Sequence, residues 1–134
     1  NYIHKDIEKF KLDNKFDLIL MFEVLEHLDN WKKTIKNIKK NLNRNGIIII
    51  STINRNLFSK LFAIDIAENI LQWIPKGTHD YNKLIKPKEL ENTLSKENFH
   101  FNNIKGLVFD PFNREWKLSK NHTINYFCSA SLIN

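Results

Sequence analysis

The first half of the chain alternates between apolar runs and amphipathic stretches. Residues 16–22 form a nearly continuous apolar run, which is typical of a strand buried on both faces of a parallel sheet. From Asp29 or Asn30, apolar side chains recur at helical spacing until Asn45-Gly46, a common helix end. A β-branched run follows at 47–52. This order of strand, helix and strand predicts a right-handed βαβ unit with parallel strands.

The second half of the chain interrupts this alternation. Residues 57–74 have the pattern of an unusually apolar helix, and we treat 57–77 as an inserted helix and loop. A shorter helix is predicted over 87–97, with Pro87 in its first turn. Strands are also predicted at 106–109, 115–118 and 125–130, the last two forming a hairpin through residues 119–122. Tyr2-Ile3 fits the end of one more strand. The pattern therefore predicts an α/β fold that ends in an antiparallel strand pair.

Composition narrows the class of protein. A chain of 134 residues with 42% hydrophobic residues can bury one modest core. The net charge of +6 is spread along the chain and does not cluster with aromatic residues, so a nucleic-acid module is the weakest reading. The single Cys128 forms no internal disulfide and favours a reducing compartment. No run reaches the roughly 18 to 20 apolar residues that cross a bilayer. Because the chain opens on Asn1, we expect a segment of a longer protein.

The residues that follow the first predicted strand are the best candidates for chemistry. Ligands of open parallel sheets bind beyond the carboxyl ends of the strands, where Phe22 to His27 lie. If a helical turn begins there, Glu23, Glu26 and His27 stand at i, i+3 and i+4 and converge on one face. Such a group can hold a divalent cation. Acidic residues are also favoured at any helix N-terminus, so the spacing alone permits both interpretations.

Two motifs resemble class I S-adenosylmethionine-dependent methyltransferases. The segment from Phe16 to Leu28 looks like the strand-four motif of that class, and Gly46 to Thr52 looks like its strand-five motif. A narrower resemblance, to the 3-demethylubiquinol 3-O-methyltransferases of ubiquinone biosynthesis, covers nearly the whole chain. It rests on Ser51 to Asn56, Pro75 to Asp80 and Ile85 to Leu90. The expected fold is thus the C-terminal portion of a Rossmann-like class I methyltransferase sheet.

The resemblance implies roles for individual residues. Phe22 takes a position that contacts the cofactor, S-adenosylmethionine, and Glu23, Glu26 and His27 match the positions that bind Mg²⁺. A cation there would lower the pKa of a substrate hydroxyl. His27 or His79 is the candidate general base, although His79 is equally well explained as a hydrogen-bonded loop residue. The implied substrate is a polyprenylated quinol or catechol that accepts the methyl group on a phenolic oxygen.

One expected feature of the class is absent from these residues. A methyltransferase of this kind needs a Gly-rich loop after its first strand. The three glycines, Gly46, Gly77 and Gly106, do not have that spacing. We therefore treat 1–134 as a partial methyltransferase domain and expect it to be catalytically incompetent without the missing half. The alternatives are a class I methyltransferase of another small molecule, and an inactive truncated copy that acts as a membrane-associated binding module.

The apolar stretch 57–74 has two interpretations. It carries Phe58, Phe62 and Trp73 beside basic Arg55, Lys60 and Lys76, which suits shallow insertion into an anionic membrane surface. A lid over the substrate cleft is the alternative. The resemblance implies peripheral membrane contact and a place in a ubiquinone-biosynthesis complex. It also implies the cytoplasmic face of a bacterial inner membrane, or the matrix side of the mitochondrial inner membrane.

Overall fold

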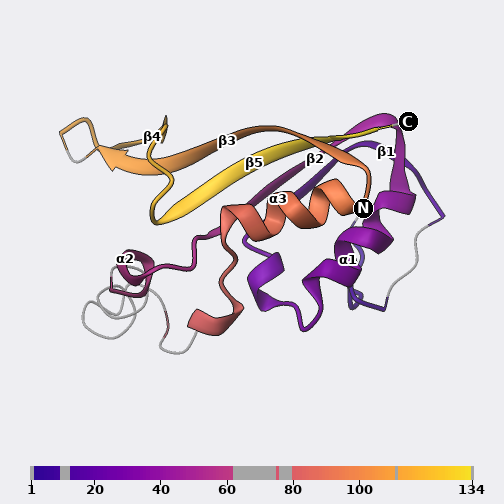
Figure 1. The fold of residues 1–134 in the computed structure, drawn as a ribbon, viewed down its shortest axis with the longest axis horizontal. Coiled ribbons are helices and arrows are strands. Elements are labelled where there is room, and N and C mark those ends of the chain that lie inside the picture. Colours follow the sequence, from indigo (N-terminus) through magenta and orange to yellow (C-terminus); the bar gives the residue numbers. More distant parts are fainter. Residues whose placement is uncertain (1, 10–12, 62–74, 76–79, 111, 134) are drawn as a thin grey trace.

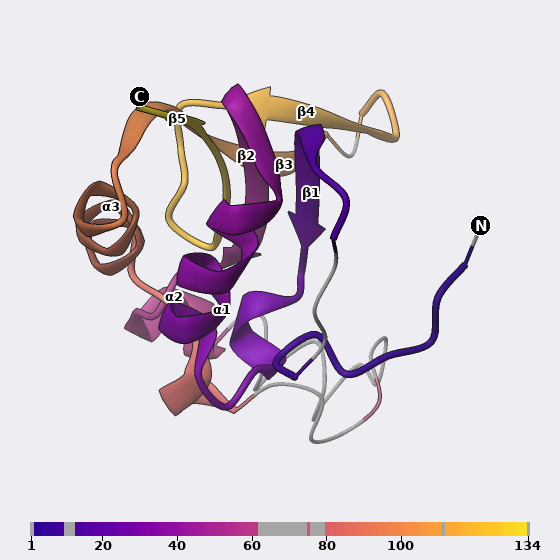
Figure 2. The same cartoon turned by 90° about the vertical axis from the view of Figure 1, so that its right-hand side faces the viewer.

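In the computed structural model, which describes residues 2–9, 13–61, 75, 80–110 and 112–133, the described strands form one mixed sheet. Its strand order is β1-β2-β5-β3-β4, and helices α1 and α3 cover one face (Figures 1 and 2). The strands are β1 (Phe16–Phe22), β2 (Leu42–Ile53), β3 (Phe99–Asp110), β4 (Glu115–Ser119) and β5 (Asn125–Leu132). The α-helices are α1 (Trp31–Ile38), α2 (Leu57–Ser59) and α3 (Pro87–Lys96), with short 3₁₀ turns at Leu25–His27, Lys39–Asn41 and Tyr81–Lys83.

The predicted βαβ unit is confirmed. Strands β1 and β2 pair in parallel, with Leu20 opposite Ile49, and α1 makes the crossover between them. The helix begins as expected, because the Asn30 side chain accepts a hydrogen bond from the Lys33 N–H at 3.0 Å. Glu8 accepts the preceding backbone N–H groups of Asp29 and Asn30, at 3.1 and 2.8 Å. These acceptors satisfy donors that a helix start leaves unpaired.

The helix ends earlier than its spacing predicts. Leu42 continues the apolar stripe of α1 and is buried, yet it belongs to β2 and lies opposite Phe16. The register between β1 and β2 is irregular just after this pair, and Asn45 adopts a left-handed conformation with φ 61°. The apolar stripe thus predicted correctly that Leu42 is buried, but wrongly that it belongs to the helix. Residues 2–3 form no strand, contrary to expectation.

The predicted pairing of the last two strands is wrong. Strand β4 pairs with β3, while β5 lies between β2 and β3 and runs antiparallel to both. The burial pattern explains this order. Tyr126, Cys128 and Ala130 of β5 are almost fully buried, as a central strand requires, whereas all of β4 except Ser119 is exposed. The expected antiparallel character of the final strand is confirmed.

Alternating side chains give the sheet a covered face and an open face. Met21, Ile48 and Ile50 belong to the core cluster, which also includes Ile35 of α1 and Leu90 of α3. On the opposite face of β1, the large apolar side chains are about half exposed; these are Leu18, Leu20 and Phe22. Strands of a parallel pair are normally covered on both faces. The open face is therefore an apolar surface of the kind that another part of a protein covers.

Gly106 lets the connection between β4 and β5 cross closely over β3. A Cβ added at this buried glycine would lie 1.8 Å from the Asn121 carbonyl oxygen and 2.7 Å from its carbon. These atoms are backbone and cannot rotate away, so the connection would have to move.

We predict that Gly106→Ala lowers the free energy of unfolding by about 1–3 kcal/mol, through overpacking. Urea denaturation measures this change, with Lys105→Ala on the same strand as the control. Equal stabilities of the two variants would show that the crossing is not tightly packed.

Candidate functional site

Glu23 lies where β1 ends, at the carboxyl ends of the parallel strands. Its backbone adopts a left-handed conformation with φ 51°, and its N–H donates to both the carbonyl oxygen and the hydroxyl of Ser51, each at 3.1 Å. The Ser51 hydroxyl in turn donates to the Glu23 carboxylate at 2.7 Å. The end of β2 therefore fixes both the backbone and the side chain of Glu23.

Glu26 is a buried carboxyl group next to this pair. Its side chain is only 3% exposed, and neither carboxyl oxygen has a hydrogen-bond partner in the part of the chain that is described. Burial, together with the neighbouring carboxylate of Glu23, raises the pKa of Glu26 to about 8. The buried Thr52 hydroxyl also lacks a described partner. Glu26 is therefore largely protonated at neutral pH.

The predicted one-face arrangement of Glu23, Glu26 and His27 does not form. A left-handed residue precedes the 3₁₀ turn Leu25–His27, so Glu23 stands outside it, and His27 is exposed while Glu26 points inward. Across the described ranges, no three His, Cys, Asp or Glu side chains are grouped to hold a metal ion. The metal site stays a prediction, now based on two close carboxyl groups. His79 lies outside the described residues.

Phe22 closes β1 on the open face of the sheet. Its ring packs edge-on against Phe127 of β5, with centroids 5.6 Å apart, and it remains about half exposed. This position beside Glu23 suits contact with a flat ligand. The role of Phe22 in cofactor binding stays a prediction.

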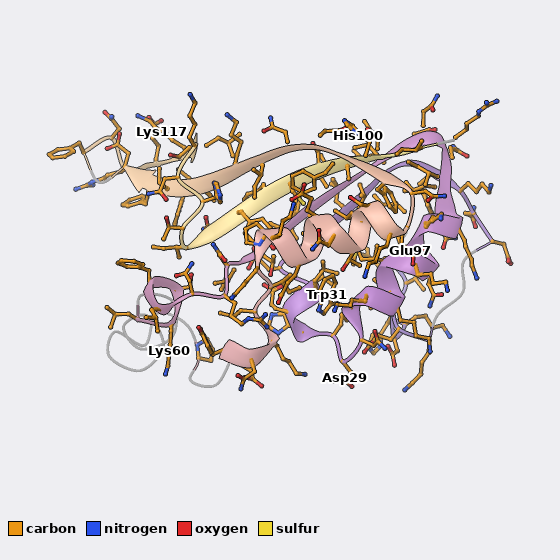
Figure 3. All side chains as sticks on the ribbon, in the orientation of Figure 1. Asp29, Trp31, Lys60, Glu97, His100 and Lys117 are labelled. Atoms are coloured by element: carbon orange, nitrogen blue, oxygen red, sulfur yellow. The ribbon has the colours of Figure 1, made fainter. Side chains whose placement is uncertain are left out.

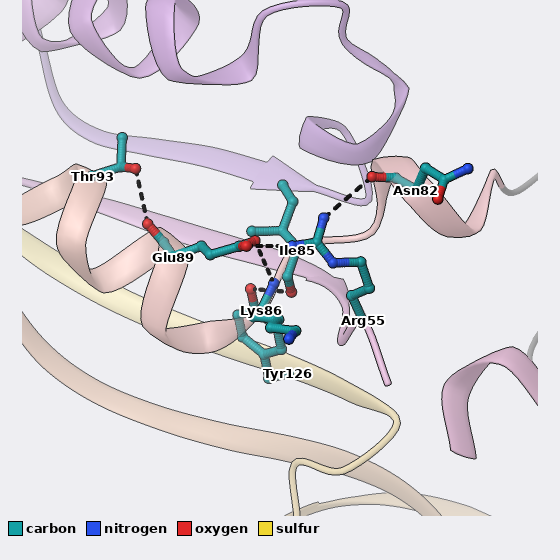
Figure 4. Close-up of polar contacts among 7 residues, drawn as sticks. All are labelled: Arg55, Asn82, Ile85, Lys86, Glu89, Thr93 and Tyr126. Atoms are coloured by element: carbon teal, nitrogen blue, oxygen red, sulfur yellow. Dashed lines mark hydrogen bonds and ion pairs between the residues drawn. The ribbon is translucent and has the colours of Figure 1, made fainter. Parts of the chain in front are cut away.

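A polar network around Arg55 borders the site. Arg55 and Glu89 lie in two of the segments that carry the family resemblance, but their contact could not be predicted from the sequence. Arg55 forms an ion pair with Glu89 of α3 and donates to the Asn82 carbonyl at 3.3 Å (Figure 4). Glu89 is the third residue of α3, and its carboxylate also accepts the Lys86 N–H at 3.3 Å, which is typical of that position. The Tyr126 hydroxyl donates to the Ile85 carbonyl at 3.0 Å.

Arg55 has a structural partner that the sequence did not predict. Its expected place as a basic neighbour of a membrane-contacting stretch stays a prediction. Its guanidinium joins the chain just after β2 to α3 and to Asn82, and so holds the segment 80–86 beside the site.

We predict a coupling free energy of about 0.5–1 kcal/mol between Arg55 and Glu89, because the pair is only partly exposed. A double-mutant cycle with Arg55→Gln and Glu89→Gln, read by urea unfolding, measures it. The exposed Lys88–Glu91 pair on the same helix, at 3.0 Å, is the matched control and should couple more weakly. Equal coupling free energies in the two cycles would show that the Arg55–Glu89 pair holds α3 no more strongly than an exposed ion pair does.

A second prediction concerns the pH dependence of stability. The pKa of Glu26 is raised in the folded state, so the fold binds this proton more tightly than the unfolded chain does. Its stabilising effect is complete below about pH 4.5 and is lost as pH rises towards about 8. Glu26→Gln should remove this loss and raise stability at pH 8 by on the order of 1–3 kcal/mol. Chemical denaturation from pH 5 to 9 tests it, with exposed Glu91→Gln as control. Parallel curves for wild type and Glu26→Gln would refute the assignment.

Solved structures with the same fold define the class. The chain superposes on magnesium protoporphyrin IX methyltransferase of Synechocystis PCC 6803 with TM-score 0.60 and 15% identity, over 96% of this chain and 49% of that one. An S-adenosylmethionine-dependent methyltransferase of Clostridium acetobutylicum gives TM-score 0.63 and 14% identity, over 97% and 63%. At this identity the likeness shows the fold alone, which is the class I methyltransferase fold.

Residues 2–104 match the methyltransferase domain family model, and the chain belongs to that family. Two curated relatives carry the name ubiquinone biosynthesis O-methyltransferase. The protein of Rickettsia typhi is 44% identical over 127 residues, which are 95% of this chain and 52% of that protein. The protein of Rickettsia prowazekii is 43% identical over 135 residues, or 100% and 54%. The chain thus spans about half the length of these relatives.

Proposed function

We propose that the chain forms part of an S-adenosylmethionine-dependent O-methyltransferase that methylates a phenolic hydroxyl of a polyprenylated quinol precursor in ubiquinone biosynthesis. The observation that carries this proposal is the identity of 40–44% along nearly the whole chain to relatives that share one name. The carboxyl groups at the ends of β1 and β2 lie where ligands of such sheets bind.

The site offers the groups that phenol methylation requires. The hydroxyl must lose its proton as its oxygen attacks the methyl sulfonium, and His27 and His79 are the candidate bases. Glu26 is neutral at physiological pH and can donate a hydrogen bond, whereas the Glu23 carboxylate accepts one. The two close carboxyl groups of Glu23 and Glu26 are the ones that would hold Mg²⁺, which would acidify the hydroxyl. The carboxyl oxygens of Glu26, without partners in the described chain, fit such a ligand if the carboxyl gives up its proton.

The open apolar face of the sheet supports the interpretation that this chain is part of a larger domain. We infer that the rest of a methyltransferase domain, with the Gly-rich loop that these residues lack, covers Leu18, Leu20 and Phe22. Among the described strands, β1 lies at the edge of the sheet and pairs only with β2, so it can accept another strand. The cofactor site would then be completed by residues outside this chain.

Membrane contact through residues 57–74 is also part of the proposal. Only 57–61 are described, and there Leu57, Phe58 and Leu61 are exposed. No helix in the described residues is long and apolar enough to span a bilayer. A peripheral position on the cytoplasmic face of a bacterial inner membrane, or on the mitochondrial matrix side, would bring the site to a membrane-borne substrate. Participation in a ubiquinone-biosynthesis complex fits the same position.

We predict that this chain alone does not bind S-adenosylmethionine measurably. A fusion with the part of the Rickettsia typhi relative that has no counterpart here should bind it, because the fusion supplies the half of that protein that this chain does not span. Isothermal titration calorimetry measures both, followed by quinol methylation assays with and without Mg²⁺.

Variants of the fusion identify the surface involved. Leu20→Asp, on the open face, should abolish binding, whereas Leu57→Asp on α2 should not. If the fusion is folded and still fails to bind, the enzyme reading is wrong, and an inactive membrane-associated copy takes its place.

A further inference from the structure

The end of β3 and strand β4 form a ribbon that leaves the sheet. Strand β3 pairs with β5 only as far as Lys105, opposite Phe127. From Leu107 to Asp110 it pairs in register with β4 alone. The Asn125 side chain of β5 still accepts the Leu107 N–H at 2.9 Å. At about 3.3 Å per residue, the three residues of β3 beyond this contact extend roughly 10 Å. Figure 1 shows this hairpin projecting from one end of the molecule.

The tip of this ribbon is aromatic and exposed. Phe112 is 96% exposed, Trp116 62% and Phe109 49%. The rings of Phe109 and Trp116 contact each other, with centroids 5.3 Å apart, and Phe112 occupies the turn. A two-stranded ribbon cannot bury such side chains by itself. Three large aromatic residues at one projecting tip therefore indicate contact with another apolar phase or partner.

The ribbon projects from the end of the sheet that carries the candidate site. Strands β2 and β3 are both antiparallel to β5, so β3 ends at the same edge as the carboxyl end of β2. Helix α2 lies at this edge too. A hollow of about 410 Å³ between them is lined by Phe58 of α2 and by residues 120–123 at the base of the ribbon. Helix α2 and the β3–β4 ribbon thus place exposed apolar side chains on either side of the sheet end that carries the candidate site.

Basic side chains accompany the aromatic tip. Lys117 forms ion pairs with Asp110 at 2.8 Å and with Glu115 at 2.9 Å, which leaves one net negative charge in this cluster. Arg114 and Lys120 are exposed, and neither forms an ion pair with a described residue. Figure 3 shows Lys117 on the ribbon and Lys60 by α2 at this same end of the molecule. Arg114 balances the remaining negative charge, so Lys120 and Lys60 beside the ribbon make the basic side chains outnumber its two carboxylates. Exposed aromatic residues with such a positive surround suit the headgroup layer of an anionic bilayer.

We propose that the β3–β4 tip, defined by Phe109, Phe112, Arg114 and Trp116, inserts into the surface of an anionic lipid bilayer. It is a membrane contact separate from residues 57–74. Together the two contacts hold the site edge towards the bilayer. The inference rests on the proposed function, because that function requires the site to face a membrane. Its test measures lipid binding and needs no catalysis.

Co-sedimentation of the chain with phosphatidylcholine vesicles containing phosphatidylglycerol tests the proposal. Phe112→Ser should weaken partitioning about ten-fold, because one buried aromatic side chain is lost. The matched control Tyr2→Ser, which removes an exposed aromatic residue outside the ribbon, should leave it unchanged. Arg114→Gln should weaken binding about five-fold, and Arg44→Gln should have little effect.

Tryptophan quenching locates the contact directly. In a Trp73→Phe background, brominated lipids should quench the emission, and Trp116→Phe should remove most of that quenching. Binding that is lost in Phe58→Ser but unaffected in Phe112→Ser and Arg114→Gln would overturn this inference while supporting contact through 57–74. If no variant and no wild-type chain binds vesicles, both membrane proposals fail and the cofactor test above is untouched. Concentration-dependent dimers that Phe112→Ser abolishes, without vesicle binding, would instead assign the tip to a second copy of the chain.

Discussion

The burial of β5 in the middle of the sheet is the constraint on which the rest of the structure depends. Its side chains Tyr126, Cys128 and Ala130 fill the covered face beneath α1 and α3, and its backbone pairs with β2 on one edge and β3 on the other. Burial raises the pKa of the Cys128 thiol to about 12 and also raises that of the Tyr126 hydroxyl, so both remain neutral. The strand therefore adds no buried charge to the core. Because β5 is antiparallel to both neighbours, it aligns the end of β3 with the site edge.

The same edge contains a carboxyl group that works against folding. Burial makes the ionised form of Glu26 costly, and the nearby carboxylate of Glu23 increases that cost. Structural carboxylates are usually paired when they are buried. The arrangement is better explained by a ligand that approaches the ends of β1 and β2 than by stability. Perturbed groups at such positions are typical of functional sites.

Sequence patterns predicted the elements better than their partners. The apolar run of β1 and the Pro87 helix start needed only local information, and both appeared where expected. The partner of β4 could not be read locally, because it depends on which strand has enough buried side chains to take the central position. The predicted arrangement of the site residues was wrong in one step, for a similar reason. The helical-face prediction assumed a regular turn from Glu23, but its hydrogen bonds to Ser51, 28 residues away, hold it in a left-handed conformation. The ion pair of Arg55 could not be read locally either, because its partner Glu89 is 34 residues distant.

The proposed substrate explains why polar and apolar features share one edge. A polyprenylated quinol has a polar ring, which needs hydrogen-bonding groups and an acid–base partner, and a tail that stays in lipid. In a right-handed βαβ unit, the connections after the parallel strands all emerge at one edge, so residues for the ring gather there. The strand direction imposed by β5 sends the β3–β4 ribbon to this edge as well. Exposed aromatic residues that would be a liability elsewhere can then meet the bilayer where the tail resides. On this proposal, one topological choice positions both the chemistry and the membrane contact.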